Sequence, residues 1–329
     1  MSRAPIVPII GGGPAGMSCA LWLHNYGLHP VIVEQETALG GMARRSPYPN
    51  EGLLGQPDQT ARENAAKFAG HIGKLGIETW LGGQPQRLRR ESDGFRLEIV
   101  LSGEVTARSI SGPALVIATG TQFRGEGWLD QVKNARQLAA AGRVHLGPAA
   151  VGEPDADLGA HVVVVGGGDN AFDVSRMLAE KGVRVTLVMR SKEPKAQPLL
   201  VERLRQYQAS GMAEVMAERT VAALEEAGSR IRVRLDDGGE ITVDHVALLF
   251  GYRPNTSEPW LAELALEKDL RGYLVVDGNM ETSCRAVFAV GDVANPGHPC
   301  IATAIGSGTM AARRIQQVLA RENVPPSGP

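Results

Sequence analysis

The chain has 329 residues, and a single hydrophobic core rarely extends over a chain of this length, so we expect two domains. With 43% hydrophobic and 21% charged residues, 40 glycines and 20 prolines, its composition is globular and excludes a low-complexity chain. The net charge of −2 gives no overall electrostatic reason to bind nucleic acid or an anionic membrane, and we expect neither.

The N-terminal segment has the pattern of a dinucleotide-binding unit. Residues 6–10 predict a short buried strand that runs into Gly11-Gly-Gly13-Pro-Ala-Gly16, followed by a helix and a second strand at 31–33. Glycines let a pyrophosphate approach the backbone closely, and the start of the helix attracts it. Glu34 ends the second strand, where a carboxylate can accept hydrogen bonds from ribose hydroxyls.

The same pattern returns in the second half of the chain. A strand at 162–165 leads into Gly166-Gly-Gly168-Asp-Asn-Ala171, and a helix and a strand at 183–188 follow. Arg190, Ser191 and Lys195 stand where an NAD-binding unit usually has an acid. Basic residues there can bind a 2′-phosphate, so we favour NADPH over NADH, although a solvated basic loop is the alternative.

Other segments predict the remaining sheets. Residues 96–100 and 105–110 alternate like a hairpin, and 231–235 and 241–243 flank a turn of Asp, Asp, Gly and Gly. Further strands are expected at 114–117, 246–250 and 287–290, and a helix from about 302 to 319.

Two dinucleotide units in one chain point to two cofactors. The acid of the first unit and the basic loop of the second favour FAD in the first and a nicotinamide coenzyme in the second. A flavin can take a hydride and pass electrons to a different acceptor, which gives a reason for two sites in one protein.

Taken together, the motifs resemble the pyridine nucleotide-disulfide oxidoreductase superfamily and, within it, the low-molecular-weight thioredoxin reductase group. The matching pieces are residues 11–16, 39–41, 118–120, 166–171, 251–256, 282–283, 287–293, 306–308 and 311–312. The resemblance implies an α/β fold of two Rossmann-like, three-layer ββα domains. An NAD(P)H domain (119–246) would be inserted into a discontinuous FAD domain (1–118 and 247–329), in a protein that is a homodimer.

The resemblance also implies which residues hold the cofactors. Asp292 would bind the ribityl chain of FAD, and the helix start at Cys300 would meet the pyrimidine edge of the flavin ring. The FAD set is Gly11, Gly13, Pro14, Ala15, Gly16, Glu34, Gly41, Met42, Tyr48, Asn50, Thr119, Gly120, Gly291, Asp292, Cys300, Ile301 and Ala302. The NADP set is Gly166, Gly168, Asp169, Asn170, Ala171, Arg190, Ser191 and Lys195.

Two members of the FAD set lie in the loop after Met42. Tyr48 falls where such reductases place a tyrosine that stacks on the flavin, and a surface tyrosine between two prolines is the alternative. Asn50 resembles an asparagine that contacts the flavin ring in thioredoxin reductases.

The cysteines depart from the thioredoxin reductase pattern. Only Cys19, Cys284 and Cys300 are present, with no CxxC and none in residues 140–160, where the family's redox pair would stand. Ala15 occupies the place of the cysteine of bacillithiol-type reductases. Such sparse cysteines fit a reducing cytoplasm, and the seven histidines show no metal-binding spacing, so no metal is expected.

Three functions remain open. The first is an FAD-dependent NAD(P)H oxidoreductase similar to the thioredoxin reductase-like ferredoxin NADP reductases, passing electrons to ferredoxin, flavodoxin or a small acceptor. The second is a disulfide reductase without CxxC, in which Cys300 is the candidate catalytic residue, against the alternative of an inert, buried thiol. The third is a flavin-binding sensor or scaffold without turnover.

Overall fold

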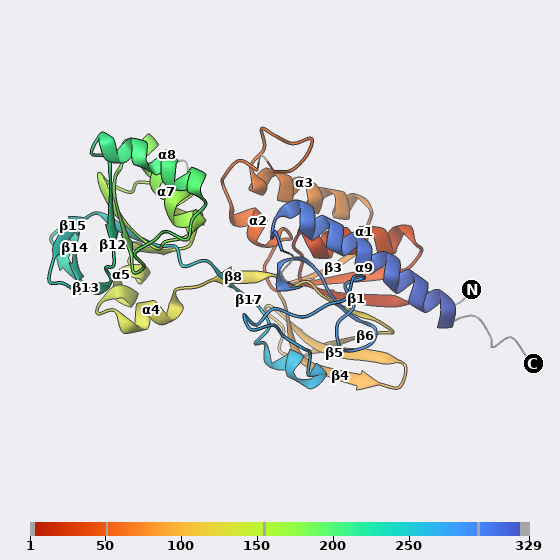
Figure 1. Cartoon of the computed structure of the whole chain (residues 1–329). Helices are drawn as coiled ribbons and strands as arrows, with labels where there is room; N and C mark the ends of the chain where they lie inside the picture. Colours follow the sequence, from red (N-terminus) through yellow and green to blue (C-terminus); the bar gives the residue numbers. More distant parts are fainter. Residues whose placement is uncertain (1–3, 51, 154–155, 295–296, 323–329) are drawn as a thin grey trace, which may run out of the picture. The chain divides into compact units, whose positions relative to one another are not determined.

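The chain folds into two compact units. The structure, a computed structural model, describes residues 4–50, 52–153, 156–294 and 297–322 (Figure 1). Unit 1 joins the described residues up to Gln122 with those from Arg253, and unit 2 is Phe123–Tyr252. The division falls a few residues later at each crossing than the domain limits expected from the sequence, at 118 and 246.

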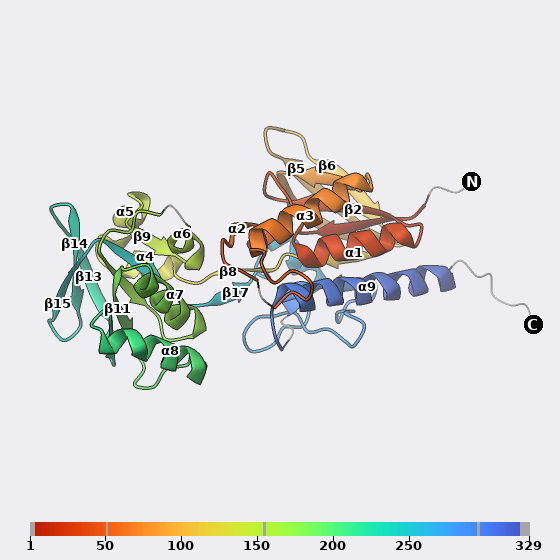
Figure 2. The ribbon, with the colours of Figure 1, turned by 90° about the horizontal axis from the view of Figure 1, so that it is seen from above.

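Unit 1 has three layers, with a parallel sheet of order β18-β7-β1-β2-β3 in the middle. An antiparallel sheet, β4-β5-β6, covers one face, and α1, α3 and α9 cover the other (Figure 1). Helices α1 and α9 lie side by side in both views (Figure 2). The strands are β1 (Ile6–Ile10), β2 (His29–Glu34), β3 (Glu78–Leu81), β4 (Gly83–Glu91), β5 (Gly94–Leu101), β6 (Arg108–Gly112), β7 (Leu115–Ile117) and β18 (Val287–Ala289). The helices are α1 (Pro14–Asn25), α2 (Gly41–Arg45), α3 (Ala61–Lys74), α9 (Ile301–Glu322) and the 3-10 turns η1 (Pro259–Leu264) and η2 (Gly291–Ala294).

The inner strands of this parallel sheet, β7, β1 and β2, are apolar on both faces because both faces are covered. On β1, Val7 and Ile9 pack toward the helices, whereas Ile10 packs toward β4–β6. Val116 and Leu115 of β7 divide between the two cores in the same way. This explains why continuous apolar runs, rather than alternating ones, mark these strands in the sequence.

Unit 2 repeats the plan of unit 1. Its parallel sheet has the order β12-β11-β10-β16-β9, and an antiparallel sheet, β13-β14-β15, packs over Val163 and Val165 of β10. The strands are β9 (Val144–Leu146), β10 (His161–Val165), β11 (Arg184–Met189), β12 (Ala213–Ala217), β13 (Val221–Ala227), β14 (Arg230–Leu235), β15 (Glu240–Val243) and β16 (His245–Leu248). The helices are α4 (Glu126–Gln131), α5 (Ala135–Ala140), α6 (Pro148–Gly152), α7 (Asp169–Glu180) and α8 (Pro198–Ala209). The predicted pair of Rossmann-like, three-layer domains is thus confirmed.

The two crossings between the units pair with each other as β8 (Thr121–Phe123) and β17 (Tyr252–Pro254). Next to these strands, the Thr119 hydroxyl donates to the carbonyl of Asn255 (3.0 Å), and the Asn255 amide donates to the carbonyl of Thr119 (2.8 Å). Gly120 accepts a hydrogen bond from the backbone of Asn255 (3.0 Å). Thr119 and Gly120 therefore tie the two chain segments together.

Candidate functional site

In the first glycine loop, the packing of the protein backbone leaves no room for a side chain at two of the glycines but does leave room at the third. A Cβ on Gly11 would lie 2.2 Å from the carbonyl oxygen of Ala118, and one on Gly16 would lie 2.0 Å from that of Gly11. At Gly13 the nearest atom to a Cβ would be the Cα of Gly41, 4.0 Å away. Gly13 precedes α1 and leaves the start of that helix open, as close approach of a pyrophosphate requires.

Glu34 holds this loop from the end of β2. Its side chain is buried, and its two carboxylate oxygens accept hydrogen bonds from the backbone N–H groups of Gly12 (2.7 Å) and Glu36 (2.8 Å). Each oxygen keeps a further lone pair for a ribose hydroxyl. The acid expected for ribose binding thus also fixes the loop.

The segment at the start of α2 completes one side of the loop. The backbone N–H of Gly40 donates to the carbonyl of Gly12 (2.8 Å), and a Cβ on Gly41 would lie 3.1 Å from the Cα of Gly13. Gly41 has a left-handed backbone (φ 53°), which glycine adopts most easily. The structure therefore brings Gly41 and Gly13, two expected FAD residues, together.

Tyr48 and Asn50 lie in the connection between α2 and α3. The carbonyl of Tyr48 accepts from the backbone N–H of Ala61 (3.0 Å), so the connection is fastened to the first turn of α3. The amide nitrogen of Asn50 is buried without a partner among the described residues, as are both polar atoms of Asn64 on α3. Sequence reasoning missed Asn64, whose only signal is a polar residue on the apolar face of the helix.

Asp292 lies in η2, just beyond β18. Burial raises the pKa of its carboxyl group, and among the described residues no hydrogen bond or ion pair offsets this. The neighbouring Gly291 (φ 73°) donates its N–H to the hydroxyl of Ser307 on α9 (2.9 Å). Such a carboxyl group fits a ligand that supplies hydroxyl donors, as a ribityl chain does.

The start of α9 is held by one threonine. The N–H of Cys300 donates to the hydroxyl of Thr303 (3.1 Å), and that hydroxyl donates to the carbonyl of His298 or Cys300. Ile301 and Ala302 form the first turn, and their backbone N–H groups are among those that a helix start leaves free for a ligand.

The second glycine loop repeats the logic of the first. A Cβ on Gly166 would lie 2.5 Å from the carbonyl oxygen of Leu249, whereas one on Gly168, just before α7, would meet nothing within 4 Å. Ala171, in place of a third glycine, is fully buried. Asn170 donates a hydrogen bond to the hydroxyl of Tyr252 (3.4 Å). This loop is therefore also open to a phosphate where it meets its helix.

A basic loop, residues 190–197, follows β11 in unit 2. The backbone N–H of Lys195 donates to the carbonyl of Gly167 (2.8 Å), which folds the loop back onto the glycine loop. The hydroxyl of Ser191 donates to the carbonyl of Glu193 (2.8 Å). Arg190 and Lys195 are exposed, and no described acid forms an ion pair with either. The cations expected to hold the 2′-phosphate thus remain available to an anion.

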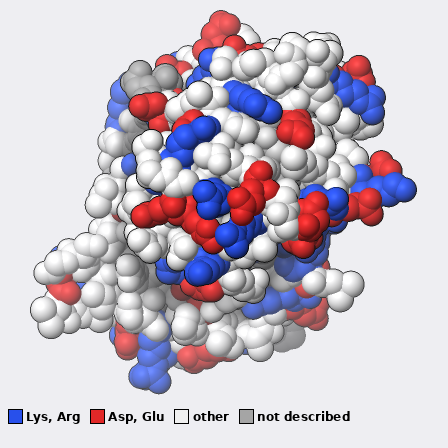
Figure 3. Space-filling view, turned by 90° about the vertical axis from the view of Figure 1, so that its left-hand side faces the viewer, with Lys and Arg blue, Asp and Glu red and all other residues white. Residues whose placement is uncertain are grey.

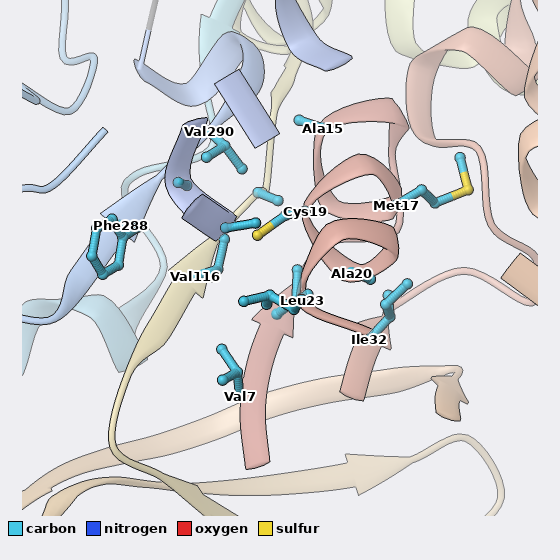
Figure 4. Packing of buried hydrophobic residues seen from close by; sticks show 14 of the residues in the cluster. Val7, Ala15, Met17, Cys19, Ala20, Leu23, Ile32, Val116, Phe288 and Val290 are labelled. Atoms are coloured by element: carbon cyan, nitrogen blue, oxygen red, sulfur yellow. The ribbon is translucent and has the colours of Figure 1, made fainter. Parts of the chain in front are cut away.

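The three cysteines are free thiols. Cys19, on α1, is fully buried beside Val116 (Figure 4), and burial raises the pKa of its thiol far above the ordinary value. Cys284 is half-buried against the core of unit 1, and Cys300 is half-buried at the start of α9. The structure thus makes Cys19 inert as a nucleophile.

Three further observations bear on the kind of function. None of the helices that the structure describes is long and apolar enough to cross a membrane. Among the described residues, no cluster of His, Cys, Asp and Glu could hold a metal ion. Basic and acidic side chains are interspersed on the face shown in Figure 3, and on β13–β15 they pair, as Arg234 does with Glu225 and Glu240.

Two glycine loops, each between a parallel strand and a helix and each open at one glycine, define a protein with two dinucleotide sites. The chain belongs to the pyridine nucleotide-disulphide oxidoreductase family, whose profile matches residues 6–317. It is an FAD-dependent NAD(P)H oxidoreductase, and members of this group use FAD and NADPH. The family resemblance predicted from the sequence motifs is confirmed.

Two relatives agree with this assignment, and a solved structure agrees with the fold. The chain is 30% identical over 294 residues to a ferredoxin–NADP reductase of Ignicoccus hospitalis, covering 87% of this chain and 88% of the relative. It is 28% identical over 320 residues to the thioredoxin reductase of Bacillus subtilis, covering 94% and 93%. The fold is similar to that of T. acidophilum thioredoxin reductase, with a TM-score of 0.79, 24% identity and coverage of 97% and 100%.

Proposed function

We propose that unit 1 binds FAD and unit 2 binds NADPH, and that electrons pass from the flavin directly to an external acceptor. Bound FAD supplies the chemistry: it takes a hydride from NADPH and releases electrons singly or in pairs. The chain's own part is to hold the phosphates at Gly13 and Gly168 and the 2′-phosphate at Arg190 and Lys195. The acceptor is a small redox protein, such as a ferredoxin or flavodoxin, or a small molecule.

The observation that carries this proposal is the state of the cysteines. A dithiol relay needs two neighbouring thiols, and this sequence has no CxxC. Cys19 is fully buried, and burial raises the pKa of its thiol. Similarity to ferredoxin–NADP reductase and to thioredoxin reductase supports the donor side of the reaction and leaves both acceptors open.

Disulfide reduction through Cys300 is the second candidate, because Cys300 is half-buried at the start of a long helix. NADPH-dependent reduction of ferricyanide and of an aromatic disulfide, by wild type and Cys300→Ser, separates the two. We expect both proteins to reduce ferricyanide equally, with Cys284→Ser as the matched control. Turnover that is limited to disulfides and lost in Cys300→Ser would overturn direct transfer. Bound FAD with no turnover would identify a sensor or scaffold.

The proposal has two further parts. The resemblance to thioredoxin reductases supports a homodimer, which sedimentation would detect. A chain with three free cysteines and no CxxC fits the reducing cytoplasm.

A further inference from the structure

An acid stands where the second glycine loop meets its helix. Asp169 is the first residue of α7, directly after Gly168. A carboxylate here is favourable for the helix dipole, but it would repel the pyrophosphate that the same helix start attracts. The loop of unit 1 has no such acid, because Pro14 occupies the corresponding place at the start of α1.

The structure shows what this carboxylate does. One oxygen accepts a hydrogen bond from the backbone N–H of Gln197 (2.7 Å), and the other accepts one from the side-chain amide of the same residue (3.1 Å). Gln197 is the N-cap of α8, 28 positions along the chain. Both carboxylate oxygens are therefore hydrogen-bonded to the same residue, and the two N–H donors stabilise the negative charge.

Gln197 also closes the basic loop. Two residues before it, the backbone N–H of Lys195 donates to the carbonyl of Gly167 (2.8 Å). The segment 195–197 is therefore fixed at both ends to the glycine loop, by Gly167 at one end and by Asp169 at the other. Lys195, an exposed cation without an acidic partner among the described residues, is held between these two ties.

We propose that Asp169 is a positioning residue that sets the preference for NADPH over NADH by holding Gln197 and, through it, Lys195 at the 2′-phosphate position. The inference rests on the NADPH site proposed for unit 2. A free loop would have to lose conformational entropy when Lys195 binds the phosphate, and the Asp169–Gln197 pair removes that cost before binding. NADH has no 2′-phosphate, so its binding gains nothing from the pair.

The test compares variants in binding and in kinetics. Binding of 2′,5′-ADP, which carries the 2′-phosphate without the nicotinamide, is measured by isothermal titration calorimetry. We expect Asp169→Ala to weaken it about tenfold and to raise the ratio of the KM for NADPH to the KM for NADH by the same factor. Asp169→Asn keeps an oxygen for the Gln197 N–H and should bind nearly as wild type.

Asp173→Asn is the matched control, since it removes a negative charge from the same helix, where Asp173 pairs with Arg176 and not with the basic loop. Unchanged or tighter 2′,5′-ADP binding by Asp169→Ala would overturn the inference, as would an equal rise of KM for NADH. If the wild-type protein itself fails to bind 2′,5′-ADP, the proposed NADPH site fails and the inference with it.

Discussion

Acidification should destabilise unit 2 through a pair of histidines. The imidazole of His145 on β9 lies 3.0 Å from that of His245 on β16, and the rings stack with centroids 5.1 Å apart. Burial, and then the neighbouring His245, lower the pKa of His145 to about 4. Burial and Arg143 lower the pKa of His245, which Asp157 and Asp244 partly oppose.

The direction of the effect follows from where protons bind. Because the pKa of His145 is lower in the folded state than its ordinary 6.5, the unfolded chain binds the proton more tightly. The contribution of neutral His145 to the free energy of unfolding is fully present above the ordinary pKa. It is lost as the pH falls from there toward the pKa of the folded state. Acidification from about pH 8 to about pH 5 lowers the free energy of unfolding by about 2 kcal/mol through His145 alone.

Urea denaturation at the two pH values measures this cost in wild type and in His145→Gln, and the difference between them cancels the other titrating groups. We expect wild type to lose about 2 kcal/mol more than the variant on acidification. The matched control is His71→Gln, at an exposed position on α3 of unit 1, which should behave as wild type. Equal losses in wild type and His145→Gln would refute the reasoning.

Three further predictions concern the two cofactor sites. Gly13→Ala should fold, because a Cβ there would approach no protein atom closer than the Cα of Gly41 at 4.0 Å, but it should lose flavin absorbance because that Cβ takes the space of the pyrophosphate. Gly70→Ala on α3 is the control, and full absorbance in the Gly13 variant would contradict the FAD site. Glu34→Gln should lower the free energy of unfolding by about 1.5–3 kcal/mol, because one buried backbone N–H of the loop would face an amide donor. An unchanged melting temperature with unchanged FAD content would refute this. Arg190→Ala should raise the KM for NADPH at least about tenfold and leave that for NADH unchanged, whereas an equal loss for both coenzymes would remove Arg190 from the 2′-phosphate site.

The strands and helices that carry the glycine loops could be predicted because several local signals coincide there. The strands that carry the glycine loops, β1 and β10, are apolar runs followed directly by glycine, and Gly11 and Gly166 have backbone angles that other residues rarely adopt. Both expected hairpins are confirmed as β5–β6 and β14–β15. The expected start of the second strand of the first hairpin, Val105, was wrong, because β6 begins at Arg108 and Val105 is fully exposed in the connection before it.

Elements with weaker local signals were missed. Strand β4 carries Arg87, Arg89 and Arg90 on exposed positions and buries little besides Leu88, so its apolar pattern is faint and its pairing with β5 defines it. Helix α3 had a readable signal, because Thr60 and Glu63 form a capping box at its start.

The candidate site was predictable where one motif contains the residues. The closeness of Gly41 to Gly13 and the bonds between Asp169 and Gln197 join distant positions, and no local pattern encodes them. Glu34 was expected at a ribose, but its bond to Gly12 depends on how the first glycine loop packs against the end of β2.

Anaerobic titration of the oxidised holoprotein with NADPH tests most directly whether electrons pass through the flavin alone. Without a dithiol the protein should accept about two electrons per bound FAD before free NADPH accumulates. The variant Cys284→Ser/Cys300→Ser should give the same endpoint. An endpoint of about four electrons per FAD, reduced to about two in that variant, would show a redox-active cysteine pair and contradict the account.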